Sequence, residues 1–276
     1  MEWSQKKRQN KKRKAFVLLL ILIAAAGIIA AIKNGEVHLQ ISPPLESSVS
    51  SEIEQVPEDK ISQYAREHGL SITEYPDILR ELLAKNPETE KFVLEYPIKK
   101  DNRFTGSLDE CANAASVPLL MQWDQRWGYT IYGDDVMGIT GCGPTSLSMV
   151  AVYLLGDTRM SPGWMAEYST QNGYCVPGNG TSWTLMSEGA EGLGLKSTEL
   201  PLVKSLVFQQ LEEGHPIICI MGPGDFTTTG HYIVLTGCED GMLKVNDCNS
   251  RERSEKLWDF DLIQGQIRNL WAFEKA

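Results

Sequence analysis

The spacing of apolar residues changes near residue 215, and this change restricts the possible folds more than any other feature of the sequence. Upstream of it the segments have helical spacing, as in Leu202–Glu213, which ends before Gly214. Downstream, four apolar runs have strand character, at residues 216–221, 231–237, 242–247 and 268–274. Asp240-Gly241 falls between two of these runs and predicts a hairpin turn. Helices followed by antiparallel strands indicate an α+β fold.

The first 57 residues have the composition of an exported protein's N-terminus. Residues 1–14 hold seven Lys or Arg and one Glu, and residues 15–32 contain no charged or polar side chain. Such an apolar run after a basic block predicts a single transmembrane signal-anchor in a cell membrane, with residues 1–14 cytoplasmic and the body outside. The alternative is a signal peptide cleaved near Ala24-Ala25-Ala26, which would release the same body. Residues 33–57, which contain Pro43-Pro44 and several serines, predict a flexible linker.

Residues 58–112 predict a helical extension and a connector in front of the main domain. Residues 58–68 and 76–85 have helical spacing. Asn86-Pro87-Glu88 supplies the cap, the proline and the early acid that open a third helix. The polar end of this stretch is the expected connector. No segment here has a pattern typical of catalysis, so we expect the extension to support the domain of residues 113–276.

Charge and cysteine content argue against two classes of function. Beyond residue 14 the chain has 19 basic and 35 acidic residues, and such an acidic body argues against a nucleic-acid partner. The six cysteines are Cys111, Cys142, Cys175, Cys219, Cys238 and Cys248. They include no CxxC pair and no His/Cys spacing suited to zinc, so no metal site is predicted. The sequence leaves open which of them, if any, form disulfides.

A nucleophile is indicated by Gly141-Cys142-Gly143-Pro144, which stands directly before an apolar helical segment. Pro144 suits the first turn of a helix, and a cysteine at a helix N-terminus is favoured as thiolate by the helix dipole. Gly141 and Gly143 leave space around the sulfur for the backbone of another molecule. The alternative is a buried inert thiol, because cysteine is among the most often buried residues.

A nucleophilic cysteine needs a base, and the base needs a group that orients it. Of the four histidines, only His231 stands where a glycine-containing loop enters a predicted strand. Asp247 closes the next strand, and a hairpin between the two strands would return their ends to one side of the sheet. Asp247 would then accept a hydrogen bond from the imidazole and fix its tautomer.

Five short segments, in this order, carry a resemblance to a known family: Gln122–Trp127, Gly141–Thr145, Gly180–Trp183, Gly230–Gly237 and Val245–Asp247. With them, residues from about 115 to 274 resemble a C39-like peptidase domain of the papain-like cysteine peptidase superfamily, which is common in exported bacterial proteins. The resemblance implies a papain-like fold with Cys142 as nucleophile and His231 as general acid/base. It further implies that Asp247 orients His231, and that Gln122 donates its side-chain amide to the oxyanion beside the Cys142 backbone N–H. No metal or organic cofactor is implied.

The function expected from this resemblance is that of a membrane-anchored, extracytoplasmic cysteine peptidase. It would hydrolyse peptide bonds of a peptide or protein substrate through a Cys-His-Asp triad and a thioacyl intermediate. The alternatives are a catalytically inactive binding protein with the same fold, and an amidase or endopeptidase acting on cell-wall peptides. The sequence departs from the family at Cys248, where the family often has proline after the aspartate. Burial, a disulfide and joint oxidation with Cys142 are all open for Cys248.

Overall fold

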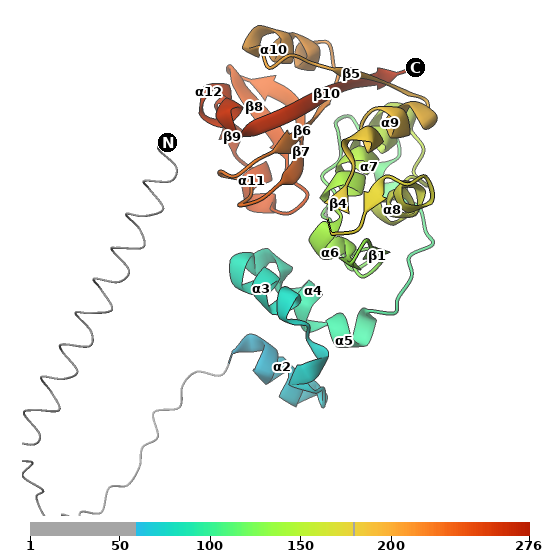
Figure 1. Ribbon diagram of the computed structural model, residues 1–276, viewed down its shortest axis with the longest axis vertical. Coiled ribbons are helices and arrows are strands. Elements are labelled where there is room, and N and C mark those ends of the chain that lie inside the picture. Colours follow the sequence, from blue (N-terminus) through green and yellow to red (C-terminus); the bar gives the residue numbers. More distant parts are fainter. Residues whose placement is uncertain (1–58, 179) are drawn as a thin grey trace, which may run out of the picture. The chain divides into compact units, whose positions relative to one another are not determined.

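The computed structural model describes residues 59–178 and 180–276, and its central element is a six-stranded antiparallel sheet (Figure 1). The strand order is β5-β10-β6-β7-β8-β9. The strands are β5 (Leu195–Glu199), β6 (Ile217–Met221), β7 (His231–Glu239), β8 (Met242–Asn246), β9 (Leu257–Trp258) and β10 (Ile267–Lys275). Two small hairpins pair β1 (Ile131–Tyr132) with β2 (Asp135–Val136) and β3 (Cys175–Val176) with β4 (Gly180–Thr181).

Helices precede and flank this sheet. The extension contains α2 (Lys60–His68), η1 (Ile72–Glu74), α3 (Asp77–Lys85), η2 (Pro87–Thr89), α4 (Glu90–Leu94) and α5 (Tyr96–Lys99), where η marks a 3-10 helix. The helices of the described chain after the extension are η3 (Asp109–Cys111), α6 (Met137–Thr140), α7 (Cys142–Leu155), α8 (Pro162–Gln171), η4 (Trp183–Leu185), α9 (Glu188–Gly192), α10 (Lys204–Glu212), α11 (Arg251–Ser254), α12 (Phe260–Ile263) and η5 (Gln264–Gln266). Within the described ranges, no helix combines the length and the apolar character needed to cross a bilayer. The predicted basic segment, transmembrane segment and linker, at residues 1–14, 15–32 and 33–57, lie outside the described residues.

Alternating side chains of the central strands build a hydrophobic layer on each face of the sheet. In β6, Ile217 and Cys219 belong to the layer shared with α10, whereas Ile218 belongs to the layer shared with α7. Every residue of α7 from Gly143 to Val152 is buried. Packing on all sides fixes the axis of α7 and therefore the position of its first residue, Cys142.

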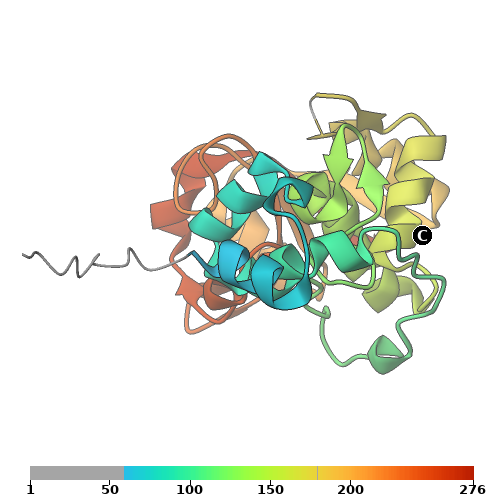
Figure 2. The ribbon, with the colours of Figure 1, turned by 90° about the horizontal axis from the view of Figure 1, so that it is seen from below.

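The helical extension shares a hydrophobic core with the segment that precedes α7. The Phe92 ring of α4 stacks on Tyr129, with 4.6 Å between the ring centroids. The Tyr129 hydroxyl donates a hydrogen bond to the Phe92 carbonyl. Both residues lie in one buried cluster with Val93 and Val136, and Figure 2 shows the extension lying over the main domain. The extension is therefore packed onto the domain through its apolar faces.

The mixed helix-and-sheet architecture confirms the predicted fold class, and β6, β7, β8 and β10 confirm the four predicted strands. The third helix of the extension is divided, because Pro97 lacks the N–H that would donate to the Val93 carbonyl; α4 ends and α5 begins anew. The edge strand β5 was not predicted, since four of its five residues are polar or charged and mostly exposed. The predicted boundary between residues 112 and 113 stays a prediction.

Candidate active site

Cys142 is the first residue of α7, and its side chain is partly exposed while the residues that follow it are buried. Burial in the protein acts to raise the pKa of this thiol. The hydrogen bond and charge of His231, together with the backbone N–H groups of Tyr232 and Gly143, outweigh burial and lower the pKa from its usual 9.0. The site therefore favours a thiolate at Cys142 beside an imidazolium at His231.

The β7–β8 hairpin brings His231 and Asp247 together. Asp240 and Gly241 form its turn with φ of 52° and 75°, values that aspartate and glycine adopt more readily than other residues. The register of the two antiparallel strands places the start of β7 beside the end of β8. His231 Nε2 lies 2.8 Å from Asp247 Oδ1. Because Nε2 is hydrogen-bonded to Asp247, Nδ1 is the ring nitrogen of His231 that can interact with the Cys142 sulfur.

Three donors hold the carboxylate of Asp247, which is 0% exposed. Oδ1 accepts from His231 and from the Asn249 N–H at 2.8 Å, and Oδ2 accepts from Arg253 Nε at 2.6 Å. Burial acts to raise the pKa of Asp247, but the charges and hydrogen bonds of His231 and Arg253 lower it to about 2. The Asp247 charge in turn raises the pKa of His231 well above 6.5, although burial opposes this. Arg253 was not predicted, because no pattern in the sequence marks it.

Gln122, the predicted oxyanion donor, is buried beside the segment that leads into Cys142. Its Nε2 donates to the carbonyls of Gly138 at 2.9 Å and Ile139 at 3.2 Å, both in α6. Its Oε1 accepts from the Cys248 thiol at 3.3 Å. The side chain therefore ties α6 to the loop after β8, and its donation to an oxyanion stays a prediction.

Cys248 is a buried free thiol. It is 0% exposed, and its sulfur lies 3.8 Å from the carbonyl oxygens of both Cys142 and Tyr232. Burial raises its pKa to about 11, so it remains protonated beside the activated Cys142. All six cysteines fall within the described residues and are free. Of the three states left open by the sequence, burial is the one observed.

His231, Asp247 and Cys248 also form a cluster of potential metal ligands within the described residues, with their ligand atoms within 4.8 Å of one another. These atoms already have protein partners, since Nε2 bonds to Asp247 and the Cys248 thiol donates to Gln122. We interpret the cluster as the interior of the candidate triad.

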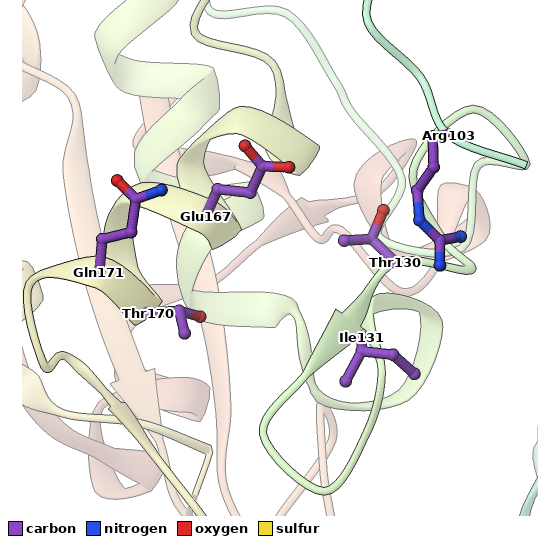
Figure 3. A pocket seen from close by; sticks show the side chains of 6 residues that line it. All are labelled: Arg103, Thr130, Ile131, Glu167, Thr170 and Gln171. Atoms are coloured by element: carbon purple, nitrogen blue, oxygen red, sulfur yellow. The ribbon is translucent and has the colours of Figure 1, made fainter.

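Two cavities lie along α8. The cavity in Figure 3, of about 260 Å³, is lined by Arg103, Thr130, Ile131, Glu167, Thr170 and Gln171. The second, of about 570 Å³, shares Glu167 and is lined further by the connector at residues 104–107 and by Trp164. Neither lining contains a predicted catalytic residue, so these cavities are separate from the candidate triad.

Gly143 is needed for close packing rather than only for access to the sulfur. A Cβ atom at this position would lie 2.5 Å from Thr181 Oγ1 and 2.6 Å from Thr181 Cβ. Thr181 cannot easily move, because its hydroxyl bonds to Tyr132 at 2.8 Å. We expect Gly143→Ala to lower the free energy of unfolding by about 1–3 kcal/mol, measured by urea denaturation. Gly265→Ala is the control, since a Cβ there meets no atom within 4 Å; equal stability of the two variants would contradict this account.

A cysteine at a helix start whose pKa is lowered by a strand-start histidine, which is itself hydrogen-bonded to a buried aspartate, defines a cysteine-peptidase-like domain. The chain belongs to the Peptidase_C39 like family, whose model matches residues 114–274. It is similar to the peptidase domain of Streptococcus ComA, a bi-functional ABC transporter involved in a quorum-sensing pathway, at 21% identity over 50% of this chain and 93% of that chain, with a TM-score of 0.39. It is also similar to a putative C39-like peptidase from Bacillus anthracis, at 17% identity over 60% and 98% of the two chains, with a TM-score of 0.36. No curated protein matches the chain.

Proposed function

We propose that this protein is a cysteine peptidase in which Cys142, His231 and Asp247 form the catalytic triad. The observation that carries the proposal is the buried 2.8 Å hydrogen bond between His231 Nε2 and Asp247 Oδ1, beside a thiol whose pKa His231 lowers. A cysteine with only a structural role would not require a neighbouring histidine that is held in one orientation and charged by a buried aspartate. Family membership supports the same class of hydrolase.

The reaction is an acyl transfer in two steps. The Cys142 thiolate adds to the carbonyl carbon of the amide, and the His231 imidazolium gives its proton to the leaving nitrogen as the C–N bond breaks. This leaves a thioester on Cys142 and a neutral His231. His231 then takes a proton from water, whose oxygen attacks the thioester, and cleavage of the C–S bond restores the thiolate and the imidazolium. Asp247 holds the ring in place and stabilises its charge throughout.

The developing oxyanion needs donors close to Cys142. We assign this role to the backbone N–H of Cys142 at the start of α7 and to the side-chain amide of Gln122. Because Gln122 Nε2 contacts two carbonyls, one N–H must exchange Ile139, its longer contact at 3.2 Å, for the substrate oxygen. The neutral amide suits the task because it donates without adding charge.

We further propose that catalysis takes place outside the cytoplasmic membrane. The basic block at residues 1–14 and the apolar run at residues 15–32 support this location. In this arrangement the substrate is an extracytoplasmic peptide or protein, or a peptide of the cell wall.

The first test is the pH dependence of thiol alkylation. Because its pKa is lowered, Cys142 should keep reacting with iodoacetamide as the pH falls to 5.5, whereas an ordinary thiol loses about tenfold of its thiolate per pH unit below about 8.5. Mass spectrometry of the Cys142, Cys175 and Cys238 peptides gives the three rates in one experiment, and the last two partly exposed thiols serve as internal references. Equal rates for the three peptides at pH 5.5 would contradict an activated Cys142.

The second test identifies the substrate class. The purified body of the protein is incubated with a peptide library and, separately, with cell-wall peptides, and Cys142→Ala is the control for both. Cleavage of the library alone favours a protein substrate, and cleavage of wall peptides alone favours the amidase or endopeptidase. An acid-shifted Cys142 with no cleavage of either would favour a binding protein that keeps the fold.

A further inference from the structure

Asp247 begins a short loop, residues 247–254, that we call the Asp247 loop; it includes α11. The loop is closed on itself by hydrogen bonds. The Ser250 N–H donates to the Asp247 carbonyl at 3.2 Å, and the Asp247 N–H donates to Ser254 Oγ at 2.9 Å. Two groups of the loop, the Asn249 N–H and Arg253 Nε, donate to the Asp247 carboxylate. The position of this carboxylate therefore depends on the shape of the loop.

The helical extension binds the outer side of the Asp247 loop, from more than 150 residues away in the chain. Glu88 Oε1 accepts from Ser250 Oγ at 2.7 Å, and Glu88 Oε2 accepts from the Arg251 N–H at 2.8 Å. Asn86 Nδ2 donates to the Asn249 carbonyl at 2.6 Å. In Figure 1 the extension around α3 lies on the side of the domain that carries α11. Three consecutive residues of the loop, 249–251, are thus tied to η2 and its cap.

These contacts require a carboxylate at position 88. Both oxygens of Glu88 accept hydrogen bonds, and its charge faces the first N–H groups of α11, including that of Glu252 at 3.4 Å. A glutamine would turn an NH2 group toward one of these donors and would lose the charge that favours a helix N-terminus. Hydrogen bonds to a charged group are also the stronger class.

We propose that Glu88 is a positioning residue for the candidate triad, holding the Asp247 loop so that Asp247 stays in contact with His231. The inference rests on the proposed function, and it assigns a role in catalysis to the extension, which lies before the matched family segment at residues 114–274. Glu88 acts through Ser250 and Arg251, which lie in the chain between Asn249 and Arg253, the two loop residues that donate to Asp247. It touches no reacting atom.

The test is the pH profile of Cys142 alkylation in Glu88→Gln. When the loop loosens, Asp247 stabilises the imidazolium less, His231 stabilises the thiolate less, and the acidic limb of the profile moves to higher pH. We expect the midpoint of that limb to rise by about one pH unit, and the rate at a pH on the limb to fall about tenfold. A residue with a merely structural role would lower the melting temperature without moving this midpoint.

The matched control is Glu90→Gln, two residues further along the extension. Glu90 pairs with Lys60 within the extension, so its loss should leave the profile unchanged. Ser250→Ala removes one of the Glu88 hydrogen bonds and also the acceptor of the Arg253 N–H, while the Arg251 N–H stays bonded to Glu88. Because the two substitutions share the Ser250–Glu88 bond, the double variant should shift the profile by less than the sum of the two single shifts.

The outcomes separate this inference from the proposed function. A wild-type Cys142 with the profile of an ordinary thiol would overturn the proposed function itself. An acid-shifted wild type with an identical profile in Glu88→Gln, or with a rate lowered equally at every pH, would overturn the role of Glu88 alone. Near-ultraviolet circular dichroism of each variant establishes that the folded protein is being labelled.

Discussion

Replacing His231 by alanine is expected to slow alkylation of Cys142 about 100-fold at pH 5.5. At this pH an ordinary cysteine is roughly 0.1% thiolate, whereas the charge and hydrogen bond of His231 favour the thiolate at Cys142. In the variant, Cys142 would have a more ordinary pKa and a smaller thiolate fraction, but each thiolate that forms would be more nucleophilic. This higher reactivity offsets about tenfold of the loss in thiolate fraction relative to the wild type. The rates are measured by mass spectrometry of the Cys142 peptide under pseudo-first-order conditions.

The variant should remain folded, which makes the comparison informative. His231 is 6% exposed at the start of β7, and its removal leaves Asp247 with the hydrogen bonds from Arg253 and Asn249, so no buried charge loses every partner. His215→Ala is the control, because His215 is partly buried and hydrogen-bonds to Gln210 instead. We expect its labelling to match the wild type. A reduction in His231→Ala no larger than that in His215→Ala would show that His231 does not activate Cys142.

The parts of the site that the sequence predicted are those set by local structure. Gly141 and Pro144 mark the start of a helix, so Cys142 could be placed at its N-terminus without knowledge of the fold. The turn at Asp240-Gly241 starts the hairpin, and the pairing of β7 with β8 brings the start of β7, with His231, near the end of β8, just before Asp247. The position of Cys142 could be inferred from one helix, and the proximity of His231 and Asp247 from two strands that are adjacent in the sequence.

The parts that were missed depend on contacts between distant segments. No motif in the sequence connects Glu88 or Arg253 with Asp247, and only the folded chain shows that Glu88 contacts the Asp247 loop and that Arg253 donates to the Asp247 carboxylate. The role of oxyanion donor was assigned to the Gln122 side chain from a family resemblance. In the structure its Nε2 donates instead to the carbonyls of Gly138 and Ile139 in α6. The rotamer of a buried amide is decided by all its acceptors together, and a sequence does not contain that information.

Phe92→Ala should have the largest effect on stability, lowering the free energy of unfolding by about 4 kcal/mol. Phe92 is 1% exposed, and its ring fills the space between the extension and the backbone of Gly128 and Gly138. Truncation leaves a cavity beneath α6, whose carbonyls receive the Gln122 amide, and removes the stacking with Tyr129. Urea unfolding measures the change, with Ile98→Ala as the control because Ile98 is 54% exposed in the same extension.

A second substitution tests whether this packing joins the extension to the site. A Cβ at Gly138 would lie 2.4 Å from the Phe92 ring, so Gly138→Ala should destabilise the wild type and be tolerated in Phe92→Ala. The double variant should therefore be more stable than the sum of the two single changes predicts. Additive effects of the two substitutions would show that the extension and the main domain fold independently. So would two unfolding transitions, of which Phe92→Ala shifts that of the extension and leaves that of the main domain unchanged. A single cooperative transition that shifts as a whole would mean that the extension is part of the folded unit that holds Cys142, His231 and Asp247 together.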